Sequence, residues 1–263
     1  MEVVPLCHAD EVGALAADLV EDLVRRTPRA VLGLATGSSP LRAYQELIAR
    51  HRAGRGPSYD EVRAFTLDEY VGLPAGDPRS YRATIAAELT DDLGLPAERV
   101  VGPDGDPAGL PSAGERFERQ VRDAGGVDLQ FLGIGTDGHL AFNEPGSSLS
   151  SRTRVKTLTR RTREDNARFF DSVDEVPRHV VTQGLGTILE ARHLLLLATG
   201  EAKAEAVAAA VEGPVSASCP ASVLQLHPRV TVILDAAAAS HLRALDYYRE
   251  VYEGKPAWQR PGA

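Results

Sequence analysis

A glycine-rich segment, residues 133–146, brings together the side chains best suited to proton transfer. It reads GIGTDGHLAFNEPG and holds Asp137, His139 and Glu144 within a few positions of one another. A histidine beside carboxylates can move protons, because its pKa lies near neutral pH. A metal site made by the same three residues is the competing interpretation, but no second histidine stands at ligand spacing nearby. A Ser-His-Asp hydrolase is disfavoured because the chain has no GxSxG segment.

Two adjacent acids, Asp68 and Glu69, follow a short apolar segment that begins at Val62. In open α/β sheets, ligands bind beyond the carboxyl ends of the strands. One of these acids is therefore a candidate general base. Successive side chains of an extended segment point to opposite sides, so we expect only one of the two to face a ligand. The alternative is a surface loop that carries two solvated acids.

Two further segments resemble anion sites. Residues 36–40, TGSSP, lie between an apolar run and a helical pattern, where we expect Ser39 to cap the helix and Pro40 to begin it. The free N–H groups of a helix start and the serine hydroxyls suit a sugar phosphate. Lys203 lies in the first turn of another expected helix, where a cation is unfavourable unless an anion binds nearby. A well-capped helix and a solvated lysine are the simpler alternatives.

The elements that must position these residues alternate between strands and helices. Residues 9–26 have the apolar spacing of a long helix. Short apolar runs predict buried strands at 31–35, 127–134, 193–198 and 230–234. The alternation predicts an α/β fold, with one doubly wound domain over residues 1–263 and a mostly parallel central sheet flanked by helices. The domain is expected to be Rossmann-like but without a GxGxxG loop.

Residues 152–178 are polar and heavily charged. We expect a lid over the site at about 158–181. The alternative is an ordinary solvated helix and turn.

Composition narrows the class of protein further. The 263 residues carry a formal net charge of -8, which disfavours a nucleic-acid partner or an anionic membrane surface. No apolar run reaches the length of a membrane span, and the first residues do not resemble a signal peptide. Cys7 and Cys219 are far apart and predict buried free thiols in a reducing compartment. A cytoplasmic protein with a small-molecule substrate is therefore expected.

Beyond these features, the chain resembles the glucosamine-6-phosphate deaminases of the isomerase type. The resemblance covers nearly the whole chain and is strongest over 32–44, 65–74, 133–159 and 222–227. The related 6-phosphogluconolactonases share a GxGxDGHxA stretch, which there typically continues with Ser-Leu-Phe-Pro. Here it continues with Phe-Asn-Glu-Pro at 142–145, which is the deaminase form.

This resemblance implies the conversion of D-glucosamine 6-phosphate and water to D-fructose 6-phosphate and ammonia, without a metal or an organic cofactor. By position, Asp68 corresponds to the base that moves a proton from C2 to C1, and His139 to the residue that opens the sugar ring. Asp137 and Glu144 correspond to the carboxylates that orient and tune this histidine. The implied phosphate contacts are Gly37, Ser38, Ser39, Arg168 and Lys203.

Some enzymes of this family are hexamers activated by N-acetylglucosamine 6-phosphate at a subunit interface. The resemblance therefore implies a homo-oligomer, with a hexamer as the expected form, and a second site for this activator. The corresponding positions are Met1, Ser147, Arg154, Lys156, Thr157 and Tyr247. An exposed basic turn after the active-site loop is the alternative.

Two other functions stay open at this point. A 6-phosphogluconolactonase-like hydrolase would release acid from 6-phosphogluconolactone, but segment 142–145 disfavours it. A non-catalytic sugar-phosphate sensor could keep the phosphate loop and Lys203, but it would not need Asp68, His139 and Glu144 together. Only the deaminase would release ammonia.

Overall fold

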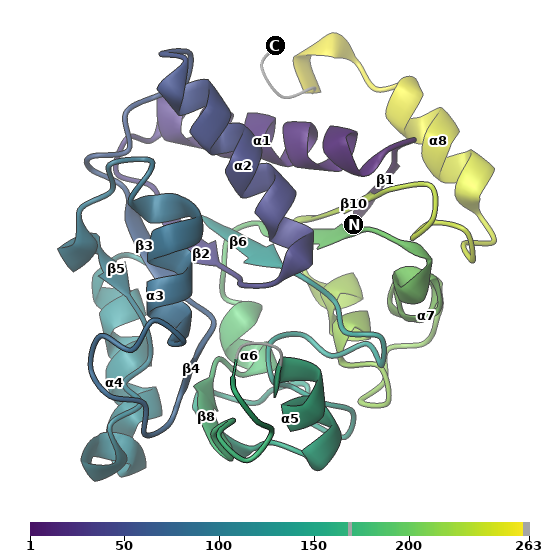
Figure 1. Ribbon diagram of the computed structural model, residues 1–263. Helices are drawn as coiled ribbons and strands as arrows, with labels where there is room; N and C mark the ends of the chain where they lie inside the picture. Colours follow the sequence, from purple (N-terminus) through teal and green to yellow (C-terminus); the bar gives the residue numbers. More distant parts are fainter. Residues whose placement is uncertain (168–169, 260–263) are drawn as a thin grey trace.

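A seven-stranded parallel sheet forms the centre of the protein, whose structure, a computed structural model, describes residues 1–167 and 170–259 (Figure 1). The strand order is β1-β10-β9-β6-β2-β3-β5, and every neighbouring pair is parallel. In chain order the strands are β1 (Glu2–Pro5), β2 (Val31–Leu34), β3 (Arg63–Thr66), β5 (Val100–Val101), β6 (Leu129–Leu132), β9 (Leu194–Ala198) and β10 (Val230–Leu234).

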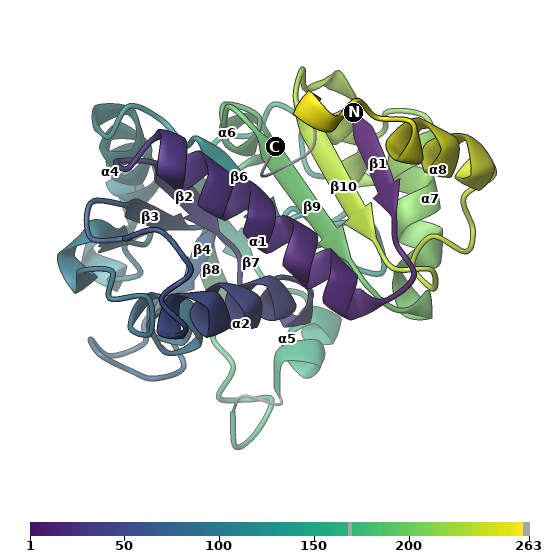
Figure 2. The same cartoon turned by 90° about the horizontal axis from the view of Figure 1, so that it is seen from above.

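Helices cover both faces of this sheet, because its central strands are apolar on both sides. Helices α1 (Ala9–Arg26) and α2 (Ser38–Arg52) lie on one face, and α6 (Leu185–Ile188) and α7 (Ala204–Glu212) lie on the other (Figures 1 and 2). The remaining α-helices are α3 (Tyr81–Ile85), α4 (Leu110–Asp123), α5 (Arg160–Asn166) and α8 (Leu245–Glu253). The predicted α/β fold with a mostly parallel central sheet is confirmed.

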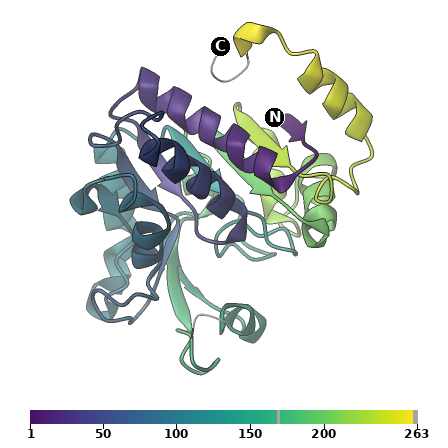
Figure 3. The same ribbon diagram turned by 45° about the horizontal axis from the view of Figure 1, so that its top comes forward.

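A second, three-stranded sheet of order β4-β8-β7 was not predicted. Strands β4 (Asp68–Tyr70), β8 (His179–Thr182) and β7 (Arg154–Thr157) are antiparallel, and α5 lies near the outer end of this small sheet (Figure 3). Only Leu67 separates β4 from β3, and its backbone bonds both to Leu34 of the main sheet and to Gln183 beside the small one. Asp68 therefore stands where the two sheets meet.

The four strands that carry the predicted site, β9, β6, β2 and β3, are neighbours in the main sheet. Because they are parallel, their carboxyl ends meet at one edge. The chain runs outward from β2 to β3 and β5 and then returns to β6 on the other side of β2, so the strand order reverses between β2 and β6. A reversal of this kind is where open α/β sheets bind ligands.

Two smaller findings concern membranes and cysteines. No helix in the described part of the chain combines the length and apolar character needed to cross a membrane. Cys7 and Cys219 are both free, but Cys7 is exposed in the turn after β1 and Cys219 is only partly buried, so the prediction of two buried thiols was wrong.

Gly33 of β2 is expected to tolerate no side chain, because it pairs with Gln130 of β6. A Cβ at Gly33 would lie 2.0 Å from Oε1 of Gln130, whose side chain is buried and cannot move into solvent. Gly33→Ala should therefore lower the free energy of unfolding by about 1–3 kcal/mol, the usual cost of overpacking. Urea unfolding measures this cost. The double variant Gly33→Ala, Gln130→Ala should recover part of it, and a neutral single variant would contradict the packing described here.

Candidate active site

Asp68 is the first residue of β4 and the most strongly perturbed carboxyl group of the site. Its side chain is buried, and among the described residues no hydrogen bond reaches its carboxylate. Burial raises the pKa of Asp68 from its ordinary value of 3.8 to about 8, and the nearby charge of Glu69 adds to the rise. A desolvated carboxylate with a pKa near the working pH is suited to act as a general base.

Glu69 has a different role, as the alternation along a strand predicts. Its carboxylate accepts backbone N–H groups from Tyr81 at 3.0 Å and Arg82 at 3.1 Å, at the start of α3, and from Tyr70 at 2.9 Å. Burial raises the pKa of Glu69 as well, against the opposing effect of these three donors. Glu69 therefore stabilises a helix start, and Asp68 is left as the candidate base.

His139 and Asp137 form a closely bonded pair in the loop after β6. Nδ1 of the histidine lies 2.6 Å from Oδ1 of Asp137, which also accepts the backbone N–H of His139 at 3.1 Å. Burial alone would raise the pKa of Asp137, but the contacts with His139 hold it below its ordinary value. The imidazole lies over Gly135, where a Cβ would come within 2.2 Å of the ring. The pair leaves Nε2 of His139 for a substrate.

Glu144, the third member of the predicted cluster, forms no hydrogen bond or ion pair with His139 in the described structure. Its carboxylate accepts hydrogen bonds from the hydroxyl of Thr162 and, at 3.3 Å, from that of Thr159, both at the start of α5. The structure therefore brings Asp137 and His139 together but connects Glu144 to the predicted lid segment. The described residues contain no group of His, Cys, Asp or Glu side chains arranged to hold a metal ion.

The predicted phosphate loop lies at the same edge of the sheet. Helix α2 begins at Ser38, with Gly37 at the N-cap position and a φ of 107°, so the prediction that Ser39 caps this helix was wrong. Gly37 and Ser38 are exposed, Ser39 is buried, and a Cβ at Gly133 would lie 3.8 Å from the Cβ of Ser39. The loops after β2 and β6 therefore lie side by side, which brings the predicted anion donors next to residues 133–146, the candidate catalytic loop.

Lys203 is positioned by β9, the neighbour of β6 in the main sheet. It ends a short 3-10 turn, Glu201–Lys203, that follows β9 and leads into α7. Arg168, the remaining predicted phosphate contact, lies outside the described residues.

The residues implied for an activator fall on two separate parts of the molecule. Arg154, Lys156 and Thr157 are on β7, and Ser147 follows the catalytic loop. Met1 and the exposed Tyr247 belong to the corner formed by β1 and α8 (Figures 1 and 2). These six positions make no single site within one chain.

Sequence reasoning missed two residues that hold the catalytic loop. The Asn143 side chain is fully buried, donates to the carbonyl groups of Leu140 and Gln183, and accepts a hydrogen bond of 2.9 Å from Arg154. The hydroxyl of Thr182 accepts the backbone N–H of Phe142 at 3.2 Å. Asn143 lies inside the motif, but its type and spacing indicate no role there. Thr182 is about 40 residues from the loop it contacts, so no local pattern indicated either residue.

Comparisons with known proteins identify the family of the chain. The model of a family described as glucosamine-6-phosphate isomerases/6-phosphogluconolactonase matches residues 7–233. A protein of Arthrobacter sp. (strain FB24) called glucosamine-6-phosphate deaminase is 60% identical over 98% of this chain and 99% of its own length. Its namesake in Mycolicibacterium smegmatis is also 60% identical, with the same coverage.

Solved structures give the same grouping. One described as a monomeric glucosamine-6-phosphate deaminase has a TM-score of 0.87 and 41% identity, and covers 92% of this chain and 100% of its own. A 6-phosphogluconolactonase from Trypanosoma brucei has a TM-score of 0.73 at 21% identity, covering 92% of this chain and 98% of its own, and shares the fold.

The fold and these comparisons together define the class to which the protein belongs. The chain belongs to the glucosamine-6-phosphate isomerase/6-phosphogluconolactonase family, and the resemblance to its deaminase members is confirmed.

Proposed function

We propose that this protein isomerises and deaminates D-glucosamine 6-phosphate to D-fructose 6-phosphate and ammonia. The observation that carries the proposal is the buried, raised-pKa Asp68, which follows β3 at the same edge as the His139–Asp137 pair. An aldose–ketose isomerisation needs a base for a carbon-bound proton and a group that handles the ring oxygen. The relatives called glucosamine-6-phosphate deaminase support the choice of substrate.

The first step is the opening of the sugar ring. His139, oriented by Asp137, transfers a proton from the C1 hydroxyl to the ring oxygen, which breaks the C1–O5 bond and leaves an open-chain aldehyde. The phosphate is held by the loop of Gly37, Ser38 and Ser39, together with Lys203 and Arg168. The position of Lys203 near a helix start is then electrostatically favourable, because its charge faces the phosphate anion.

In the second step, the C=O group at C1 is converted to a hydroxyl and a C=N group forms at C2. The Asp68 carboxylate removes the C2 proton, and the C2–H electron pair forms the C1=C2 bond of an enolamine. The π electrons of the C1 carbonyl move to O1, which takes a proton from water. Asp68 then returns a proton to C1, which leaves a protonated imine at C2. Water adds to this imine and ammonia leaves. Every proton is handled by a residue of this chain or by water.

The residues that surround this chemistry suggest how it is enclosed and regulated. Glu144, bonded to Thr159 and Thr162, connects the catalytic loop to the segment at about 158–181, which we propose acts as a lid. Arg154, Lys156, Thr157 and Ser147 of one subunit, with Met1 and Tyr247 of another, would bind N-acetylglucosamine 6-phosphate in a homo-oligomer. The separation of the two groups within one chain supports a site shared between subunits.

The test of the function is release of ammonia and fructose 6-phosphate from glucosamine 6-phosphate, without added metal, in the presence and absence of N-acetylglucosamine 6-phosphate. Equal amounts of both products are expected, with light scattering reporting subunit number. Acid release from 6-phosphogluconolactone without ammonia would point to the lactonase, and binding without turnover to a sensor.

The rate should depend on pH through Asp68. The base is active when ionised, so kcat/KM should rise about tenfold per pH unit below pH 8 and level off above it. The measurement is kcat/KM from pH 5.5 to 9.5. The inflection should persist in a His139→Gln variant assayed with a substrate that cannot cyclise, and a wild-type profile that falls between pH 6 and 8 would contradict the assignment of Asp68.

A further inference from the structure

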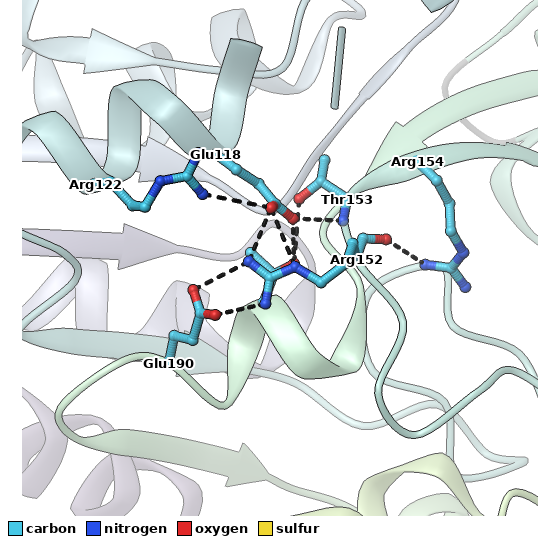
Figure 4. Close-up of polar contacts among 7 residues, drawn as sticks. Glu118, Arg122, Arg152, Thr153, Arg154 and Glu190 are labelled. Atoms are coloured by element: carbon cyan, nitrogen blue, oxygen red, sulfur yellow. Dashed lines mark hydrogen bonds and ion pairs between the residues drawn. The ribbon is translucent and has the colours of Figure 1, made fainter. Parts of the chain in front are cut away.

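A buried carboxylate outside the active site, Glu118 of α4, joins three parts of the chain (Figure 4). Its Oε1 accepts the backbone N–H of Thr153 at 2.7 Å and the hydroxyl of Thr187 at 2.6 Å. Its Oε2 accepts Nε and Nη2 of Arg152 at 3.1 and 2.8 Å. The proposed chemistry does not use Glu118, yet its carboxylate accepts four hydrogen bonds from three residues.

The charges around Glu118 are balanced, so that the carboxylate stays ionised. Arg152 also pairs with Glu190 at 2.5 Å, and Arg122 lies 3.8 Å from Oε2 of Glu118 (Figure 4). Burial alone would raise the pKa of Glu118, but the Thr187 hydroxyl, Arg152 and the Thr153 backbone hold it below its ordinary value. Charge-assisted hydrogen bonds of this kind are the strong ones, and they give the contact a defined geometry.

The backbone at this point allows little movement. A Cβ at Gly114 would lie 2.2 Å from the carbonyl oxygen of Thr153, so α4 packs directly on the chain at that residue. Thr153 immediately precedes β7. Glu118 and Gly114 thus both contact the chain at the residue before β7.

The first residue of β7, Arg154, lies in a row of paired residues across the small sheet that ends at Asp68. Arg154 pairs with Thr182 of β8, and Thr182 pairs in turn with Asp68 of β4. From this row, Arg154 donates to Asn143 at 2.9 Å, and the Thr182 hydroxyl accepts the N–H of Phe142 at 3.2 Å. The base and the catalytic loop thus both depend on the position of β7.

We infer that Glu118 is a positioning residue for catalysis, which sets Asp68 and segment 140–144 through the first residues of β7. This inference rests on the proposed function. The described phosphate donors follow strands β2 and β9 of the main sheet, away from the partners of Glu118 named above. A displaced small sheet should therefore impair the chemical step more than the binding of substrate.

The test compares Glu118→Gln with Glu21→Gln. Glu21 is a matched control, because it is also buried and pairs with two arginines, Arg25 at 2.9 Å and Arg50 at 3.3 Å, but on α1. Glu118→Gln should lower kcat about tenfold and leave KM within about twofold, since small misplacements of reacting groups reduce rates strongly. Glu21→Gln should lower Tm with both constants unchanged. Thr187→Val, a milder change at the same carboxylate, should lower kcat about threefold.

A second readout does not depend on turnover. Hydrogen exchange of the backbone amides in 139–144 and 154–157 should be faster in Glu118→Gln than in the wild type, and unchanged in Glu21→Gln. If both glutamine variants lose stability alike, with normal kcat and unaltered exchange in these segments, the inference is overturned. A wild type that releases no ammonia would instead refute the proposed function, and the exchange data would still decide the role of Glu118.

Discussion

Replacement of Asp68 by asparagine is expected to lower kcat by about 10³-fold, within the usual contribution of a general base. Asparagine has nearly the same shape but cannot accept the C2 proton. The phosphate donors lie on other loops, so binding of a reduced, open-chain amino-hexitol 6-phosphate, measured by calorimetry, should change by less than about threefold. Turnover is measured as ammonia release.

The same substitution should stabilise the fold at high pH. The pKa of Asp68 in the folded chain is raised from 3.8 to about 8, so stability falls as pH rises through this range and the group loses its proton against burial. Removing the charge should therefore raise Tm at pH 9, by about 2–4 °C for each kcal/mol recovered. A residue whose ionised form lowers the stability of the fold is expected where the function needs a base.

Asp128→Asn is the matched control for both effects. This carboxylate accepts the backbone N–H of Val31 at 2.8 Å and pairs with Arg192 at 2.9 Å, at the opposite edge of the sheet. It should lower Tm and leave kcat within about twofold. Near-normal turnover of Asp68→Asn would show that another group is the base.

The second large effect is expected from His139→Gln. Glutamine cannot exchange a proton near neutral pH, so turnover of the cyclic substrate should fall about 10²-fold, in the range typical of acid–base groups. An analogue that lacks both the C4 and the C5 hydroxyls can form neither a furanose nor a pyranose ring, and it therefore bypasses the opening step. The variant should therefore recover a large part of its rate with this analogue, followed by ammonia release.

The wild type gives the comparison for this experiment. It should process the analogue no more than about tenfold faster than the variant does. An equal 10²-fold loss with both substrates would mean that His139 acts in the proton transfer between C2 and C1 and not in ring opening.

The elements that could be predicted from sequence are those with a local signal. Helix α1 (Ala9–Arg26) has the predicted bounds, and the predicted apolar runs contain β2, β6, β9 and β10. Because these strands are parallel, the loops that follow them meet at one edge of the sheet. The chemistry-bearing motifs lie on such loops, so their grouping could be predicted from the order of the elements alone.

The small sheet gave no such signal. Strand β4 begins with two acids, and β7 alternates charged and uncharged residues, so neither has an apolar run. Their pairing joins Asp68 to Thr182 and Thr182 to Arg154, contacts that depend on the whole fold. For the same reason, neither the bonds of Glu144 to Thr159 and Thr162 nor those of Glu118 could be read from spacing along the chain.

The central claim is that ammonia is released by isomerisation and not by direct substitution at C2. Glucosamine 6-phosphate deuterated at C2 separates the two routes. The account predicts ammonia and an equal amount of fructose 6-phosphate, with the C2–D bond broken and the deuterium either at C1 or in water, as mass spectrometry and NMR would show. An aldose 6-phosphate that keeps its deuterium at C2, or no ammonia from the folded protein, would contradict it.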